Sequence, residues 1–151
     1  MTALRFVRSP GLGVVQSYIW PGAEMRVTAA RPGTVNFELD VKKEHTNRLG
    51  IVHGGTIASM VDLGGSLAVA SHGLFATGVS TDLNVTYLNS GGKIGDKLLA
   101  EVTCDKIGKT LAYTTIRFTN PANEVIARGS HTKYISFAYK DPNNIVGQVK
   151  D

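Results

Sequence analysis

The amino-acid sequence predicts an α+β fold in which one long central helix is wrapped by a curved antiparallel β-sheet. The order of the elements is the first indication: one strand, one helix, and then four strands joined by short turns. The helix is apolar almost all round, which is typical of a helix covered on most sides. It also contains Gly64 and Gly65, which let a sheet approach closely at roughly 1 kcal/mol each in helix propensity.

The spacing of apolar residues locates the first strand and the helix. Apolar side chains recur at every second position from Gly33 to Lys43, which indicates a strand. A polar loop at 45–50 follows. From Gly55 to about Ala70 the spacing becomes helical, and Gly73 is a suitable stop after the last turn.

Four further strands are expected after the helix. In the first, 79–87, the alternation is interrupted at Thr81, and Ser80 is expected on the face opposite Leu83. Turn residues separate the later strands. Those strands are expected at 97–105, 111–119 and 124–137.

Length and composition fit one ordinary domain. The chain has 151 residues, 42% of them hydrophobic and 19% charged, which is enough to bury a core. No apolar run approaches the ~18–20 residues that cross a bilayer, so we expect no membrane insertion. We divide the chain into an N-terminal extension (1–25), a main domain (26–137) and a flexible C-terminal tail (138–151).

The composition of residues 1–23 bears on where in the cell the protein is located. Residues 1–23 contain Arg5 and Arg8 and no acidic residue, as import sequences do, but their prolines and glycines break an amphipathic helix. The single cysteine, Cys104, excludes a disulfide within the chain and fits a reducing compartment. We expect a cytoplasmic protein, with mitochondrial import as the alternative.

The net charge of +4 is unevenly distributed. Residues 93–133 contain seven basic and four acidic side chains. The basic residues are dispersed and lack interleaved aromatic side chains, so the sequence does not favour nucleic acid as a partner. This modest surplus suits a small polyphosphorylated ligand such as the nucleotide end of coenzyme A.

Two features of the helix suggest that it carries catalytic groups. Asp62 lies in the middle of an apolar helix, where a carboxylate is costly unless it is paired or used, although a solvent-facing position is the alternative. His53, Gly54 and Gly55 precede the first turn, and no Ser, Thr, Asp or Asn caps it. The free N–H groups of such a turn can hold an oxyanion. The alternative is a simple tight turn.

The spacing between Gly54 and Asp62 determines whether both can belong to one site within a single chain. Asp62 lies eight residues after Gly54, which is ~12 Å along a helix. The carboxylate therefore cannot direct water onto a carbonyl held at its own helix start. If both belong to one site, Asp62 serves the turn of a second copy, and a two-fold homodimer forms two such sites.

An ordered set of motifs runs through about residues 30–135. It comprises His45-Thr46-Asn47, Gly50, His53-Gly54-Gly55, Val61-Asp62, Gly78-Val79-Ser80, Asp82, Asn84, Thr86-Tyr87, Gly108-Lys109-Thr110-Leu111-Ala112 and Gly129-Ser130-His131-Thr132-Lys133. This set resembles the hotdog-fold acyl-CoA thioesterases of the phenylacetate-degradation type, most closely the thioesterase superfamily member 2 group. The resemblance implies that 26–137 is a hotdog thioesterase domain.

The resemblance also implies catalytic roles. Asp62 matches the family's acid, which acts as general base on water or, in the rival mechanism, attacks directly. The Gly54 N–H matches the oxyanion donor. Asn47 matches the residue beside the thioester, His53 a residue that supports the loop, and Ser80 the hydroxyl that holds the attacking water.

The implied substrate is an acyl-CoA, with a medium- to long-chain fatty acyl group, and neither a metal nor a separate cofactor is expected. The implied assembly is a homotetramer built as a dimer of dimers. The turn at 89–92 departs from the Ser-Pro-Ala turn usual in the family, which puts the individual CoA contacts in doubt. The implied CoA-binding positions are Lys43, Tyr87, Asn89, Ser90, Gly91, Gly92, Lys106, Gly108, Lys109, Thr110, Leu111 and Tyr134.

Two other functions stay open. A non-catalytic acyl-CoA binding module would use the same fold and groove. A hotdog dehydratase or hydratase resembles a different pattern, with a His on a Pro-Gly type loop, whereas Gly55 follows Gly54 here. A serine hydrolase is disfavoured because the sequence has no Gly-x-Ser-x-Gly motif.

Overall fold

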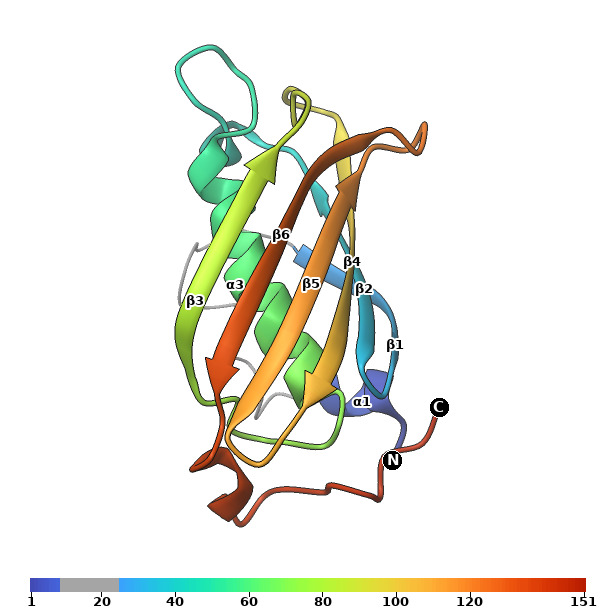
Figure 1. The fold of residues 1–151 in the computed structure, drawn as a ribbon. Helices are drawn as coiled ribbons and strands as arrows, with labels where there is room; N and C mark the ends of the chain where they lie inside the picture. Colours follow the sequence, from blue (N-terminus) through green and yellow to red (C-terminus); the bar gives the residue numbers. More distant parts are fainter. Residues whose placement is uncertain (9–24) are drawn as a thin grey trace.

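The computed structural model describes residues 1–8 and 25–151, and a six-stranded antiparallel sheet curls around the helix α3 (Figure 1). The predicted fold class is confirmed. The strand order in the sheet is β1-β2-β4-β5-β6-β3. The described residues include no helix whose length and hydropathy would suit a membrane span. The elements are α1 (Ala3–Val7), β1 (Met25–Arg31), β2 (Thr34–Asp40), η2 (Lys43–His45), α3 (Gly54–Ala70), β3 (Val79–Tyr87), β4 (Lys97–Ile107), β5 (Leu111–Thr119), β6 (Val125–Tyr134) and η3 (Ala138–Lys140).

Strand β1 was not predicted from the sequence pattern, and neither was the short helix α1. The strand pairs with β2 through a turn in which Gly33 has φ +84°, a conformation that favours glycine. A bulge between Val27 and Ala29 breaks its alternation, which explains why period-two spacing did not indicate a strand. The last strand was predicted too long, because β6 ends at Tyr134 and is followed by η3.

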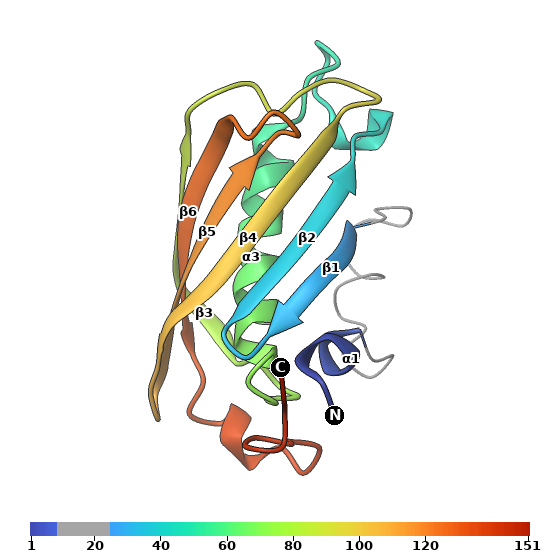
Figure 2. The same cartoon turned by 90° about the vertical axis from the view of Figure 1, so that its right-hand side faces the viewer.

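Cross-strand ion pairs join β1, β2 and β4. Arg26 contacts Glu38 at 2.6 Å and Asp40 at 2.8 Å, and Lys97 contacts the same two carboxylates. The hydrogen bonds from Arg26, and then those from Lys97, lower the pKa values of Glu38 and Asp40. This network links the edge strand β1 to β2 and, through the β2 carboxylates, to β4; Figure 2 shows these three strands in that order.

The helix α3 packs into the concave face of the sheet, and its two inner glycines permit the contact. A Cβ atom at Gly64 would lie 2.8 Å from Ile116 Cδ1, and one at Gly65 would lie 2.3 Å from His131 Nδ1. The expected role of this glycine pair is therefore observed. The core around it is formed largely by Phe37, Met60, Leu67, Leu98 and Phe118.

Strand β3 is the edge of the sheet beside α3 and pairs with β6 alone (Figure 1). Its apolar side chains are exposed: Val79 to 63%, Leu83 to 36% and Tyr87 to 51%. An edge strand with free backbone groups and apolar side chains is a surface on which another strand can pair.

The C-terminal residues lie along the end of the molecule where α3 finishes. Ile145 N–H donates to the Gly73 carbonyl at 2.9 Å, and Ala3 N–H donates to the Lys150 carbonyl at 3.1 Å. The two ends of the chain are therefore neighbours (Figure 2). Most of the expected N-terminal extension, 9–24, falls outside the described residues, and the predicted division of the chain stays a prediction.

Candidate active site

Asp62 lies midway along α3, on the helix face turned towards β6 and β3. Its side chain is 46% exposed, and Oδ1 is 3.6 Å from Nε2 of His131. The carboxylate is thus open to solvent on one side and faces a buried polar group on the other. It does not point into a sealed core.

His131 is the buried group beside this carboxylate. It is 1% exposed, and its Nε2 lies 2.8 Å from Ser80 Oγ, within hydrogen-bonding distance. Burial first, and then the charge of Lys133, lower the pKa of His131, while Asp62 acts in the opposite direction. The imidazole is therefore neutral near pH 7. Ser80, His131 and Asp62 form one polar cluster.

A β-bulge brings Ser80 into this cluster. Leu83 pairs with His131 and Ser80 with Lys133, with a register shift between Ser80 and Asp82. Since paired residues share a face of the sheet, Ser80 and Leu83 both face the helix. The sequence prediction that they lie on opposite faces is wrong, because the extra residue at the interrupted position reverses the alternation.

Sequence reasoning missed His131 and Lys133 as members of the cluster. Both face the helix, because positions two apart on a strand point to the same side. Lys133 is 3% exposed, and its Nζ lies 3.0 Å from Ser66 Oγ, one helical turn beyond Asp62. The pattern of β6 did not indicate this, because its adjacent residues Ile126 and Ala127 are both buried and its alternation is incomplete.

The start of α3 carries the second set of predicted residues. The His53 Nδ1 accepts a hydrogen bond from Gly55 N–H at 2.8 Å, so the helix has an N-cap that the sequence analysis did not expect. Within the described part of the chain, the Gly54 N–H has no hydrogen-bond partner. The Tyr87 hydroxyl donates to the Gly54 carbonyl at 2.7 Å. Tyr87 therefore lies at this turn.

Asn47 shapes the loop that precedes the helix. Its Oδ1 accepts hydrogen bonds from the N–H groups of Leu49 at 2.9 Å and Ile51 at 3.3 Å. His45 is buried beneath the loop, and its carbonyl accepts from the Thr56 hydroxyl. Asn47 is thereby held at the same end of the molecule as Gly54.

The structure divides the predicted catalytic residues into two groups. Asn47, His53 and Gly54 lie at the start of α3, whereas Asp62 and Ser80 lie halfway along it. Eight residues of helix separate Gly54 from Asp62, which corresponds to ~12 Å. Within one chain, the two groups of candidate residues are therefore separate.

The predicted CoA-binding residues are also divided. Ser90, Gly91 and Gly92 line a cavity of about 510 Å³ at the end where α3 begins. Residues 106–111 comprise the end of β4, the turn at 108–110 and the first residue of β5, and they lie at the opposite end (Figure 1). Tyr134 lies at that second end too, opposite Leu111 in the sheet. One chain does not bring the two sets together.

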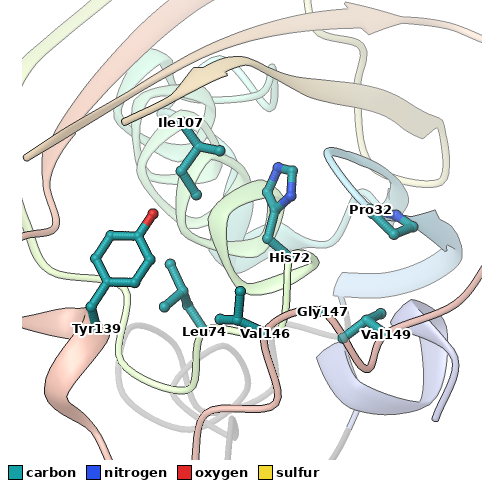
Figure 3. A pocket seen from close by; sticks show the side chains of 8 residues that line it. All are labelled: Pro32, His72, Leu74, Ile107, Tyr139, Val146, Gly147 and Val149. Carbon is teal, nitrogen blue, oxygen red and sulfur yellow. The ribbon is translucent and has the colours of Figure 1, made fainter. Parts of the chain in front are cut away.

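A second cavity lies near the end of α3 (Figure 3). It measures about 220 Å³ and contains none of the predicted site residues. Its lining includes His72, Leu74, Ile107, Tyr139 and Val146. The cavity is thus distinct from both halves of the candidate site.

Comparison with known proteins identifies the family. Residues 49–127 match the model of the Thioesterase superfamily. Human acyl-coenzyme A thioesterase 13 is 40% identical over 113 residues, which cover 74% of this chain and 80% of that protein.

Solved structures agree with this match. Zebra fish thioesterase superfamily member 2 has a TM-score of 0.71 at 39% identity, covering 87% of this chain and 91% of that one. The smu.793 protein of Streptococcus mutans, solved bound to acetyl CoA, has a TM-score of 0.69 at 27% identity, covering 78% and 93%. The chain belongs to the thioesterase superfamily and is a thioester hydrolase with a hotdog fold.

Proposed function

We propose that the protein hydrolyses acyl-CoA, with medium- to long-chain fatty acyl groups as substrates, to a free acid and CoA. The observation that carries the proposal is the half-exposed Asp62 carboxylate beside the exposed Ser80 and its buried partner His131. The human relative named as an acyl-coenzyme A thioesterase and the Streptococcus mutans neighbour bound to acetyl CoA support this substrate class.

In the proposed reaction, water adds to the thioester carbonyl and Asp62 takes its proton as general base. Ser80 holds the water beside the carboxylate. The Gly54 N–H stabilises the oxyanion of the tetrahedral intermediate. The C–S bond then breaks, and the CoA thiolate receives a proton. Asn47 binds next to the thioester, and attack by the Asp62 carboxylate itself is the rival mechanism.

The reaction requires two chains, because the oxyanion turn and the general base of one chain lie too far apart. Pairing of two β3 edges about a two-fold axis would lay two α3 helices antiparallel. The Gly54 turn of one copy would then face Asp62 of the other. The exposed apolar side chains of β3 support this pairing. A dimer of dimers would supply CoA contacts from a further chain at Lys106–Leu111.

The test is release of free thiol from acyl-CoA substrates of increasing chain length. Asp62→Asn should reduce kcat by about 10²–10⁴-fold, the usual contribution of a general base. Glu101→Gln is the control, since Glu101 is exposed and contacts Asn36; its kcat should stay within about twofold of wild type. If the wild-type protein binds acyl-CoA without releasing thiol, the chain is a binding module and the proposal fails.

A further inference from the structure

The cluster beside Asp62 contains a buried cation that the proposed reaction does not use. The Lys133 side chain is 3% exposed, and its Nζ donates to Ser66 Oγ at 3.0 Å. Among residues 1–8 and 25–151, no carboxylate forms an ion pair with it. A buried ammonium without an ion-pair partner is costly, so its position requires an explanation.

Lys133 is close to both members of the Asp62–His131 pair. Ser66, its hydrogen-bond partner, is four residues after Asp62 and lies on the same face of α3. Lys133 is two residues after His131 on the same face of β6. The charges of Asp62 and Lys133 act on His131 in opposite directions.

The surroundings of His131 are otherwise uncharged in the described structure. From α3 it faces the Asp62 carboxylate. From β3 it meets Ser80 Oγ, and from β5 the Thr114 hydroxyl, which donates to the His131 carbonyl. Lys133 is therefore the cation that opposes the Asp62 carboxylate at this ring.

The protonation state of His131 decides what Asp62 can do. Asp62 Oδ1 is 3.6 Å from Nε2, so a protonated imidazole would form an ion pair with the carboxylate. The carboxylate would then be held as a counter-ion and would be a poorer base for water. A neutral imidazole has one donor and one acceptor nitrogen and can share a hydrogen bond with Ser80 instead.

We propose that Lys133 is a positioning residue whose buried charge adds to the effect of burial in keeping His131 neutral, so that Asp62 stays free to activate water. The consequence for catalysis rests on the proposed function, whereas the effect on His131 does not. Lys133 acts through His131 and touches neither substrate nor water.

The test is Lys133→Met, which keeps an unbranched side chain and removes the charge. NMR titration of His131 in the substrate-free protein should show that its pKa rises, because one of the two influences that lower it is lost. The kcat/KM of the variant should fall at a higher pH than that of wild type. The loss should be about fivefold or more near pH 6 and within about twofold near pH 8.5.

Ser66→Ala is the matched control, because it removes the hydrogen bond of Lys133 but keeps the charge. His131 should titrate in this variant as in wild type. An unchanged titration of His131 in Lys133→Met would overturn the proposal. The titration does not depend on turnover, so it separates this proposal from the proposed function.

If the Lys133→Met variant does not fold, a measurement on the wild-type protein tests the proposal instead. Burial lowers the pKa of Lys133, and the Asp62 carboxylate opposes this. NMR of the Lys133 Nζ should show a charged ammonium at the pH where His131 loses its proton. A neutral amine at that pH would also overturn the proposal.

Discussion

Gly65 is the residue that makes room for His131. The imidazole Nδ1 would lie 2.3 Å from a Cβ atom at this position, and the Thr114 hydroxyl oxygen would lie 2.8 Å from it. The neighbouring Gly64 faces a different group, the terminal methyl of Ile116 at 2.8 Å, which can move aside. Adjacent glycines of one helix thus have different tasks, close packing in one case and placement of the polar cluster in the other.

We therefore expect Gly65→Ala to lower both stability and kcat. Overpacking should cost about 1–3 kcal/mol in the free energy of unfolding, partly offset by the better helix propensity of alanine. Displacement of His131 should lower kcat severalfold. Urea unfolding and steady-state kinetics measure both effects. Gly64→Ala is the control, and equal activity of the two variants would contradict this role of Gly65.

At the level of single residues, only part of the candidate site could be predicted from the sequence. Asp62 and Gly54 could be identified from the sequence because each breaks a simple rule: Asp62 is a charge in an apolar helix, and no Ser, Thr, Asp or Asn immediately precedes the first turn at Gly54. His131 and Lys133 could not be, because polar residues on a strand are expected to face solvent. Only the approach of α3 shows that these two are buried.

At the level of elements, one-residue irregularities account for the main errors. The interruption at Thr81 was visible in the sequence, but the resulting reversal of faces depends on the pairing partner, which the sequence alone does not give. Strand β1 was missed for a related reason, the bulge after Val27. The helix α3 and the other five strands were predicted correctly in type, because each retains enough of its characteristic spacing even where a bulge interrupts it.

Strand β3 is the element on which the proposed assembly of the site depends. We expect Asp62→Ala and Asn47→Ala chains to be inactive separately and to recover about a quarter of wild-type activity when mixed equally. Half of the random dimers are mixed, and each mixed dimer has one intact site of two. Thiol release after proven subunit exchange measures this recovery.

The control for subunit mixing is Leu83→Arg in both chains. This change places a charge on the exposed β3 edge and should prevent pairing, so mixing should restore no activity. Full activity of a purified monomer, or no recovery after exchange without this change, would contradict a site shared between chains.

For the molecule as a whole, buried histidines link stability to pH. Burial is the main cause that lowers the pKa values of His45, His72 and His131 below their ordinary value of 6.5. The three lie in different parts of the fold: under the loop before α3, at the cavity beyond its end, and beside Asp62. Each is neutral in the folded chain at a pH where the unfolded chain takes up protons.

Stability should therefore be fully present above about pH 6.5 and decline as pH falls below it, because protons bind preferentially to the unfolded state. Urea unfolding between about pH 8 and pH 5 measures the free energy of unfolding. His72→Phe removes one of the three groups and should make the decline shallower. A free energy of unfolding that is constant over this interval would contradict the expectation.

If each site is shared between two chains as proposed, the distance along α3 between Gly54 and Asp62 also has a genetic consequence. A chain with a mutation at one of these positions still has the other residue intact and can contribute it to a site shared with a normal chain. In a diploid cell with one damaged allele, every mixed pair would keep one working centre. Such an allele would therefore reduce activity in proportion to its dose and would not be dominant-negative.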